Sequence, residues 1–391
     1  MTMAENKDKK VLNVPHLRFP EFSGEWEEHT LSQYLEFKNG LNPDAKRIGS
    51  GLPFISVMDI LSEGVINYDN IRGKVNATEK EIECFGVKDG DVLFQRSSET
   101  LEDVGRANVY MDNRTAIYGG FVIRGRKIGN YAPLFFKYLL ATPLARKRTC
   151  KMGAGAQHFN IGQEGLSKIS LYFPSIEEQR KIAGFLSLID ERIATQNKII
   201  EDLKLLKSAI SLNVLHSDTW EQFKVKDIAQ IGRGRVISSI EISQQKSPTY
   251  PVYSSQTSND GIMGYLDDYM FEGEYISWTT DGANAGTVFY RNGKFNCTNV
   301  CGLLKLIKGF DTHFVSLVLA EATKKYVSIN LANPKLMNNT MGNIQIRLPK
   351  LEEQKRISIV FRVLQRLWTI HNSLLTEYIK QKQYLLSQMF I

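Results

Sequence analysis

Hydrophobic residues recur at alternating intervals of three and four along two long segments, one in the middle of the chain and one at its end. Such a heptad pattern is typical of helices that pack along a narrow apolar seam. We therefore predict two long helices, over residues 175–216 and 350–391, whose seam residues are structural. The first seam contains Ile182, Leu186, Ile189, Ile193, Ile200 and Leu203, and the second contains Ile357, Phe361, Leu364, Trp368, Leu375 and Tyr378.

The two seams match each other position by position at one constant offset along the chain. Even their polar interruptions coincide, because Gln196 corresponds to His371 and Lys207 corresponds to Lys382. Matched seams of this length favour packing of one helix against the other, and short connections favour an antiparallel pair. Packing of each helix onto its own domain remains the alternative.

The same motif, Pro-x-x-Glu-Glu-Gln, opens both predicted helices. Residues 169–182 read ISLYFPSIEEQRKI and residues 344–357 read IQIRLPKLEEQKRI, so six of the fourteen positions are identical. The glutamates fall in the first helical turn, where the helix dipole stabilises negative charge. Ser175 and Glu178 form a capping-box pattern in the first copy, whereas Lys350 replaces the serine in the second. The chain is therefore an internal duplicate with an approximate two-fold repeat.

The segments outside the long helices read as two related globular domains. Residues 90–94 (GDVLF) resemble residues 273–277 (GEYIS), and each stretch reads as a turn followed by a strand. Amphipathic helices are expected later in each domain, near residues 133–148 and 313–328. The predicted fold class is therefore α/β, with two mixed α/β domains and two long antiparallel coiled-coil helices. A disordered tail is expected over residues 1–14, and the domains are expected over residues 15–174 and 217–349.

The charge of the chain suggests its class of partner. A net charge of +7 with a pI near 9.0 favours a polyanion, most often nucleic acid. No apolar run has the length of a membrane span, and the lysine-rich start of the chain is unlike a secretory signal, so we expect a cytoplasmic protein without a membrane partner. The four cysteines lack zinc-ligand spacing, and no metal site is predicted.

The sequence lacks the motifs of the obvious catalytic classes. It has no Gly-x4-Gly-Lys-Ser/Thr loop for ATP, and residues 333–336 (NPKL) keep only the first two residues of the Asn-Pro-Pro-aromatic motif of adenine methyltransferases. We therefore expect a non-catalytic chain. Two alternatives stay open: an enzyme whose nuclease or methyltransferase site is assembled from distant residues, and a structural or inhibitory coiled-coil protein that binds subunits but not DNA.

Polar loops in both domains supply residue types that bind DNA. Arginine can bind guanine O6 and N7 with two hydrogen bonds, and asparagine or glutamine can do the same for adenine. The candidates of the first domain are Arg96, Ser97, Ser98, Arg106, Lys151, Gln157 and His158, and those of the second are Arg233, Arg235, Tyr253, Ser254, Ser255, Thr280, Asp281, Asn284 and Lys335. For each of them the alternative is a solvated loop residue or a turn former, and for Tyr253 it is partial burial.

Taken together, these motifs resemble the specificity subunit of type I restriction–modification systems. The resemblance rests on Pro-x-x-Glu-Glu-Gln at the start of both long helices and on residues 17–26 (LRFPEFSGEW), and it covers nearly the whole chain. Lys350, Trp368 and His371 are small departures from the family pattern.

In that family the two domains are target recognition domains, and each reads one half of a bipartite DNA sequence. The resemblance implies that the helices form an antiparallel spacer, which sets the distance between the halves and docks two modification (methyltransferase) subunits. It further implies that double-stranded DNA is a partner and that restriction (translocase/nuclease) subunits join through the assembled complex. S-adenosylmethionine, ATP and magnesium would be used by those partner subunits, and this chain itself would bind no cofactor.

Overall fold

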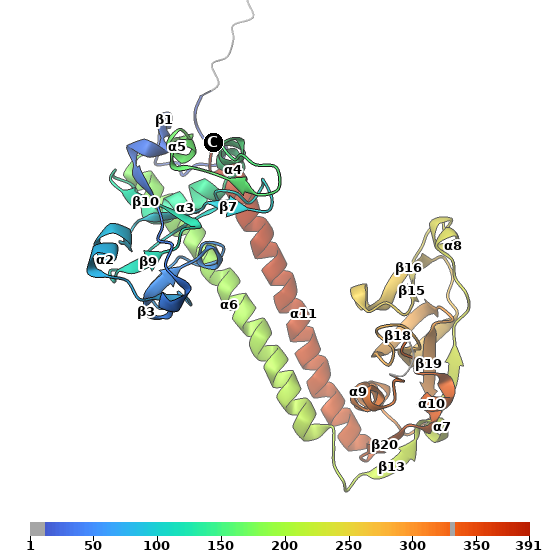
Figure 1. Ribbon diagram of the computed structural model, residues 1–391. Coiled ribbons are helices and arrows are strands. Elements are labelled where there is room, and N and C mark those ends of the chain that lie inside the picture. Colours follow the sequence, from blue (N-terminus) through green and yellow to red (C-terminus); the bar gives the residue numbers. More distant parts are fainter. Residues whose placement is uncertain (1–11, 329–332) are drawn as a thin grey trace, which may run out of the picture. The chain divides into compact units, whose positions relative to one another are not determined.

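The computed structural model describes residues 12–328 and 333–391 (Figure 1). The chain forms two compact units, of which the first contains residues up to 197 together with 373–391 and the second contains residues 198–372. Both long helices, α6 (Ile176–Val214) and α11 (Leu351–Gln388), therefore contribute to both units. Residues 1–11 of the predicted tail lie outside the described residues, whereas the C=O of Asn13 accepts a hydrogen bond from the N–H of Trp26.

The first unit contains two four-stranded sheets and two short strand pairs. One sheet is antiparallel with the order β2-β10-β6-β8, and the other has the order β4-β3-β9-β5 with β3 parallel to β9. β1 pairs with β12, and β7 pairs with β11. The strands are β1 (Glu27–Thr30), β2 (Leu35–Asn39), β3 (Ile48–Ile55), β4 (Lys74–Val75), β5 (Gly86–Val87), β6 (Val92–Gln95), β7 (Ser97–Ser98), β8 (Ala107–Val109), β9 (Ala116–Tyr118), β10 (Val122–Lys127), β11 (Phe159–Asn160) and β12 (Ser170–Phe173), and the shorter α-helices are α1 (Val57–Ile60), α2 (Glu79–Phe85), α3 (Pro133–Ala141), α4 (Pro143–Lys151) and α5 (Gln163–Ser167).

The second unit contains a six-stranded sheet with the order β14-β19-β17-β18-β15-β16 and a separate pair of β13 with β20. Its strands are β13 (Glu221–Lys224), β14 (Ala229–Arg233), β15 (Tyr250–Tyr253), β16 (Ile262–Leu266), β17 (Phe271–Thr279), β18 (Val288–Cys297), β19 (Cys301–Leu306) and β20 (Gln345–Leu348). Its shorter α-helices are α7 (Val225–Ile228), α8 (Ser239–Ser243), α9 (Thr312–Ala322) and α10 (Asn338–Asn343).

The strand order repeats between the units, since β2-β10-β6 corresponds to β14-β19-β17. In this correspondence Ile123 pairs with Phe94 in the first sheet, and Gly302 pairs with Trp278 in the second. The sequence comparison that matches Phe94 with Ser277 is therefore wrong by one residue. The reason is that Gly273 lies inside the long strand β17 and does not belong to a turn before it.

The late helices also differ from their predicted bounds. The helix expected near residues 133–148 is two helices, α3 and α4, which meet at Thr142 in an extended backbone conformation. Pro143 begins α4, and a proline nitrogen carries no hydrogen with which to continue the preceding helix. In the second unit α9 ends at Ala322 and is followed by a short 3-10 turn.

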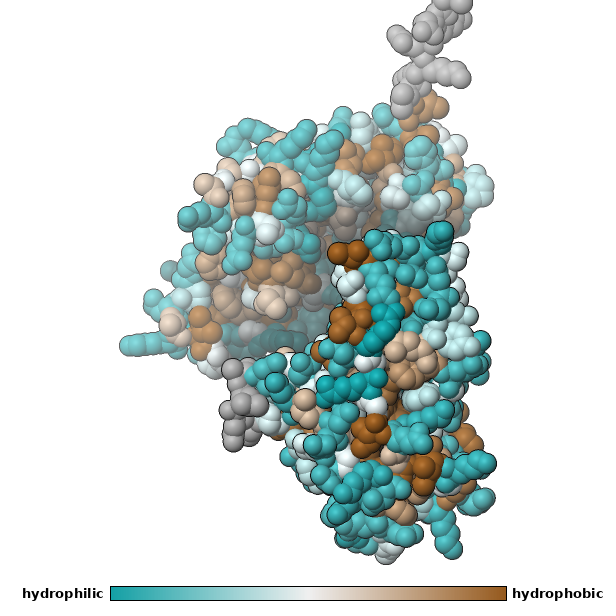
Figure 2. Space-filling view, turned by 90° about the vertical axis from the view of Figure 1, so that its right-hand side faces the viewer, coloured by the Kyte–Doolittle hydropathy of each residue, from teal (hydrophilic) through white to brown (hydrophobic). Residues whose placement is uncertain are grey.

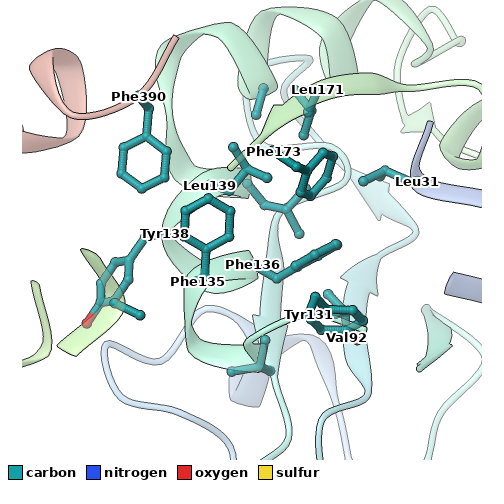
Figure 3. Close-up of a cluster of buried hydrophobic side chains, with 14 of the residues drawn as sticks. Leu31, Val92, Tyr131, Phe135, Phe136, Tyr138, Leu139, Leu171, Phe173 and Phe390 are labelled. Atoms are coloured by element: carbon teal, nitrogen blue, oxygen red, sulfur yellow. The ribbon is translucent and has the colours of Figure 1, made fainter. Parts of the chain in front are cut away.

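The core of the first unit gathers aromatic side chains from α3, from β12 and from the end of the chain (Figure 3). The ring of Phe390, just after α11, lies 5.4 Å from that of Phe135 and 6.1 Å from that of Trp26. The N–H of Leu17 also donates to the C=O of Gln388 at 2.9 Å. The C-terminal end of α11 is therefore part of the core of the first unit.

The glutamine of the repeated motif fastens each long helix to the start of the late helix in its own domain. Gln179 accepts a hydrogen bond from the N–H of Ala132 at 3.1 Å and donates to the C=O of the motif proline at 3.0 Å. Gln354 makes the same two bonds, to the N–H of Asp311 at 3.0 Å and to its own proline at 2.8 Å. Both glutamines are buried, so these bonds replace water that neither group can reach.

The second glutamate of the motif has a different role in each copy. Glu178 is buried, and its carboxylate accepts hydrogen bonds from Arg18 at 2.7 and 2.8 Å and from the indole N–H of Trp26 at 3.4 Å. The two sequence signatures, at residues 17–26 and at the helix start, are thus in direct contact. Glu353, its counterpart in the second copy, is exposed.

The two helix starts are also capped differently. The N–H of Glu178 donates to the Ser175 hydroxyl at 3.3 Å, which is one half of the predicted capping box, while the Glu178 carboxylate turns to Arg18. In the second copy the N–H groups of Glu353 and Gln354 donate to the C=O of Lys350. Ser175 makes the equivalent backbone bond to Gln179, so the second copy differs in lacking the side-chain bond.

Within the first unit, the start of α6 packs against the end of α11. Lys382 forms an ion pair with Asp190 at 2.6 Å, and Arg192 donates to the hydroxyl of Tyr378 at 3.4 Å. Residue numbers thus rise along α6 in the direction in which they fall along α11, so the two helices run antiparallel. Figure 1 shows these parts of the two helices side by side, and their antiparallel direction within the first unit agrees with the prediction.

Within the second unit, the end of α6 packs against the start of α11. Lys207 donates to the side chain of Gln365 at 3.4 Å, and Ile210 belongs to the same apolar cluster as Ile357 and Phe361. The direction is again antiparallel.

Most of the predicted seam residues are shielded from solvent. Ile182, Leu186, Ile189, Ile193, Ile200, Ile357, Phe361 and Leu364 are buried, and Leu203, Leu375 and Tyr378 are half-buried. Trp368 departs from the pattern, because it is 36% exposed and lies beside a hollow of about 320 Å³ that Leu203 and Leu364 also line. Its ring therefore lies at the edge of the seam.

Candidate nucleic-acid interface

Three chain segments meet at the end of β6 in the first unit. The N–H of Arg96 donates to the C=O of Phe121 at 2.9 Å, and its C=O accepts from the N–H of Ile161 at 3.0 Å. The N–H of Gly105 closes the loop by donating to the C=O of Gln95 at 3.0 Å. All of these bonds join backbone groups, and we call this set of hydrogen bonds the backbone frame. The frame fixes the loops while leaving the side chains free to differ.

The same frame recurs at the end of β17 in the second unit. The N–H of Thr280 donates to the C=O of Val300 at 3.2 Å, and its C=O accepts from the N–H of Leu336 at 2.8 Å. The N–H of Gly286 donates to the C=O of Thr279 at 2.8 Å. Each recognition loop is therefore built on one duplicated pattern of backbone bonds.

Several candidates of the first domain are brought together on this frame. Ser97 and Ser98 form β7, which pairs with β11, and the Ser97 hydroxyl donates to the side-chain oxygen of Asn160. Gln157 and His158 are exposed in the hairpin that leads into β11. Arg96 is half-buried, and its guanidinium donates to the C=O of Gly120 at 3.4 Å.

Two other candidates of the first domain make their contacts elsewhere in that domain. Arg106 forms an ion pair with Asp103 at 2.6 Å and lines a hollow together with Lys147 and Cys150. Lys151 is exposed in the last turn of α4. Neither residue belongs to the paired strands β7 and β11.

In the second domain the two arginines are held by side chains. Arg233 donates to the side-chain oxygen of Asn338 at 2.9 Å. Arg235 pairs with Glu241, and the hydrogen bond from Arg235 lowers the pKa of that carboxyl. Asp281 and Lys335 form a β-bridge at the position that corresponds to Ser97 and Asn160 in the first domain.

Some candidates of the second domain use their polar groups internally. Thr280 is buried, and its hydroxyl donates to the C=O of Val300 at 2.9 Å, so its predicted contact with a base is corrected to a structural role. The C=O of Asn284 accepts the N–H of Thr287 in a turn, while the Asn284 side chain is exposed. Ser254 and Ser255 are half-buried. The N–H of Ser254 donates to the C=O of Gly261 at 2.9 Å.

Tyr253 is half-buried against an arginine that sequence reasoning missed. The guanidinium of Arg291 lies 3.6 Å from the centre of the Tyr253 ring, and it forms an ion pair with Asp260 at 2.8 Å. Burial raises the pKa of the Tyr253 hydroxyl. Arg291 is itself buried within β18, and no local signal distinguishes it from a solvated arginine. It holds the loop after β15 in place.

The described residues contain no group of three or more histidine, cysteine, aspartate or glutamate side chains placed to hold a metal ion. Among the same residues, none of the helices combines the length and the apolar character needed to cross a membrane. The face shown in Figure 2 is largely hydrophilic, and its hydrophobic residues form small separate patches.

Comparison with known proteins decides the family. The model of the type I restriction modification DNA specificity domain matches residues 23–205 and again residues 217–381. The chain belongs to this family. The double match coincides with the internal repeat, so each copy of the repeat is one specificity domain with its long helix.

Relatives of this specificity protein occur in Mycoplasma pneumoniae (strain ATCC 29342 / M129 / Subtype 1). It is 37% identical over 205 residues to the putative type I specificity subunit S.MpnORF201P, an alignment that covers 52% of this chain and 85% of that protein. It is 43% identical over 149 residues to the type I restriction enzyme MpnII specificity subunit, which covers 38% of this chain and 44% of that one.

Solved structures support the fold. The S subunit of a type I restriction-modification system from M. genitalium matches with a TM-score of 0.69 at 15% identity, covering 97% of this chain and 99% of that one. A chain from a study of complex assembly in a type I R-M system matches with a TM-score of 0.53 at 14% identity, covering 93% and 97%. These matches extend over both specificity domains and both long helices.

Proposed function

We propose that each domain of this specificity subunit reads one half of a bipartite sequence in double-stranded DNA, and that the paired helices set the gap and carry two modification subunits. The observation that carries this proposal is the duplicated backbone frame with different side chains. A common frame presents both loops in the same way, while different side chains select different bases.

The differences between the two loops are chemical. Arg96, a donor, corresponds to the buried Thr280, and Ser97 corresponds to the acidic Asp281. Arg233 occupies the neighbouring strand β14 of the second domain, within reach of Asn338. The two domains therefore present different donors and acceptors and would read different half-sites.

Sequencing of methylated sites tests this proposal, in cells that carry the chain and its modification partner. Replacing Arg96 and Ser97 by alanine should relax one half of the recognised sequence, and replacing Arg233 and Lys335 by alanine should relax the other. Loss of one bidentate base contact costs roughly 1–3 kcal/mol, which is a large loss of discrimination at one base pair. The exposed Lys380→Ala is the control and should leave both halves unchanged. A change that always appears in both halves, or in neither, would refute the proposal.

The docking role of the helices is supported by a second apolar stripe on α11. Val360, Val363, Leu367 and Ile370 follow a heptad spacing and are between 39% and 52% exposed. An exposed heptad stripe is the surface that a further helix would cover. We propose that a helix of a modification subunit packs there.

A pair of charged substitutions tests the docking site. Val363→Glu together with Ile370→Glu should weaken binding of the modification subunit more than tenfold, because a buried carboxylate without a partner is costly. Lys380→Glu on the same helix is the matched control and should bind normally. Equal binding by all three proteins, measured by titration of the modification subunit, would place the docking site elsewhere.

The chemistry of the complex would reside in its other subunits. We propose that S-adenosylmethionine, ATP and magnesium are used by the modification and restriction subunits, and that the restriction subunits join through the assembled complex. A cytoplasmic location follows from access to DNA. Methyl transfer from S-adenosylmethionine by the isolated chain would contradict this division of labour.

A further inference from the structure

An exposed apolar patch lies beside the recognition loop of the first domain. Ile48, Met58 and Phe121 are 54%, 73% and 68% exposed. All three line one hollow of about 440 Å³, which Leu41 and Phe54 also line. A contiguous patch of exposed apolar side chains is typical of a binding site, whereas single exposed apolar residues are not.

Phe121 is presented by a tightly held turn. The N–H of Val122 donates to the C=O of Gly119 at 2.9 Å, which closes the turn. A Cβ atom added to Gly120 would lie 1.8 Å from the side-chain oxygen of Asn42, so a larger residue would fit there only if that side chain moved. The turn therefore fixes the backbone from which the side chain of Phe121 projects.

The patch is continuous with the proposed DNA interface. The backbone N–H of Arg96 donates to the C=O of Phe121, and the Arg96 guanidinium reaches the C=O of Gly120. A DNA helix that contacts the side chains of Arg96 and Ser97 would also come close to Phe121.

The second domain differs from the first at the place that corresponds to the side chain of Phe121. Val300 occupies the position of Phe121 and is half-buried, and the exposed Asn299 replaces Gly120. The same backbone frame thus carries a large, exposed apolar side chain in the first domain and a smaller, half-buried one in the second. This is the difference expected of a group that selects bases.

We propose that Phe121, together with Met58, contacts the C5-methyl group of thymine in the half-site read by the first domain. The thymine methyl is the apolar group that a base pair offers at its major-groove edge, and phenylalanine is among the side chains that contact it. This inference rests on the proposed function, because it names one base that the first domain selects.

Deoxyuridine supplies the direct probe, since it differs from thymidine only by this methyl group. The complex of chain and modification subunit is titrated with duplexes in which single thymines of the first-domain half-site are replaced by deoxyuridine. At one position or more, we expect binding to weaken about fourfold, the effect of one methyl group lost from an apolar contact. Deoxyuridine in the other half-site serves as the control.

The variants show whether Phe121 makes the contact. Phe121→Ala and Phe121→Ser should bind the thymine and deoxyuridine duplexes equally, whereas Phe121→Leu should keep a preference for thymine. Met58→Ser should reduce the preference. The side chain of Phe121 is exposed, so these proteins should retain the circular dichroism and melting temperature of the unmodified chain.

The inference fails if deoxyuridine has no effect in that half-site, if the half-site contains no thymine, or if the alanine variant keeps the preference. Loss of a protein partner by Phe121→Ala with an unchanged preference for thymine would reassign the patch to a protein interface. The domain-specific substitutions of Arg96 and Arg233 test the proposed function separately, because they assign half-sites to domains without reference to Phe121.

Discussion

At the scale of the residue, the repeated motif acts through contacts that no local pattern contains. Gln179 and Gln354 make equivalent bonds in both copies. Glu178 and Glu353 do not, because only Glu178 meets Arg18, which lies 160 residues earlier in the chain. The motif is visible in the sequence, but the partner of its glutamate is visible only in the fold.

Replacement of Glu178 by glutamine should lower the free energy of unfolding by about 1.5–3 kcal/mol, because the change removes a charged hydrogen-bond partner from Arg18 in a buried site. Chemical denaturation measures this. Glu353→Gln is the matched control, since that side chain is exposed and its replacement should change stability by less than about 0.5 kcal/mol. Equal effects of the two changes would contradict the role given to Arg18.

The roles of some single residues can be predicted from the sequence, and the roles of others cannot. The polar loops were found from their composition, and the structure gathers Ser97, Ser98 and the loop that carries His158 at one place. Thr280 was assigned to DNA although its hydroxyl is used inside the domain. Arg291 was missed, because an arginine at alternating strand positions gives no sign of its burial.

At the scale of the element, the long helices were predictable because the heptad pattern is local and repeated. The direction of the pair followed from chain order, and the contacts within each unit confirm it. The sheet register was harder to predict from the sequence. Gly90 and Gly273 have similar sequence surroundings, although the first lies in a turn and the second inside a strand. The division between α3 and α4 depends on one proline.

The contact between α9 and α11 should make the second unit sensitive to acid. His313 lies in the first turn of α9, and its ring is within hydrogen-bond distance (2.9 Å) of the Ser358 hydroxyl on α11. Burial, with a smaller effect of the positive charge of Arg362, lowers the pKa of His313 to about 4. Between about pH 6.5 and 4 the unfolded chain therefore binds a proton that the folded chain does not, so stability falls as the pH falls through this range.

Replacement of His313 by glutamine should remove this part of the pH dependence. The melting temperature of the unmodified protein should drop more between pH 7 and pH 4.5 than that of the variant. Gln230→Ala, a change at an exposed side chain of the second unit that carries no titratable group, is the control and should melt with the same pH dependence as the unmodified protein. Parallel curves for His313→Gln and the unmodified protein would show that His313 is not the group that titrates.

At the scale of the whole molecule, duplication explains why one chain would recognise a divided sequence. The family match occurs twice, the backbone frame occurs twice, and each long helix begins with the same bonded glutamine. The sequence alone predicts this architecture because repeats are visible without a structure. The bases recognised were not predictable, because they depend on how a few side chains project from the frame.

If the paired helices set the distance between two reading domains, as we propose, a change of helix length should change the gap between the half-sites. Residues 201–207 of α6 and residues 365–371 of α11 belong to the same antiparallel contact, in which Lys207 bonds Gln365. Duplication of both stretches inserts one heptad into each helix, preserves the seam and keeps Leu367 and Ile370 of the proposed docking stripe. Each helix lengthens by about 10.5 Å, close to the rise of three base pairs of DNA.

Sequencing of methylated sites in cells with the lengthened chain and its modification partner is the decisive measurement. We predict that both half-sites stay the same while the gap between them becomes longer, by about three base pairs. An unchanged gap with unchanged half-sites would contradict a spacer role of the helices.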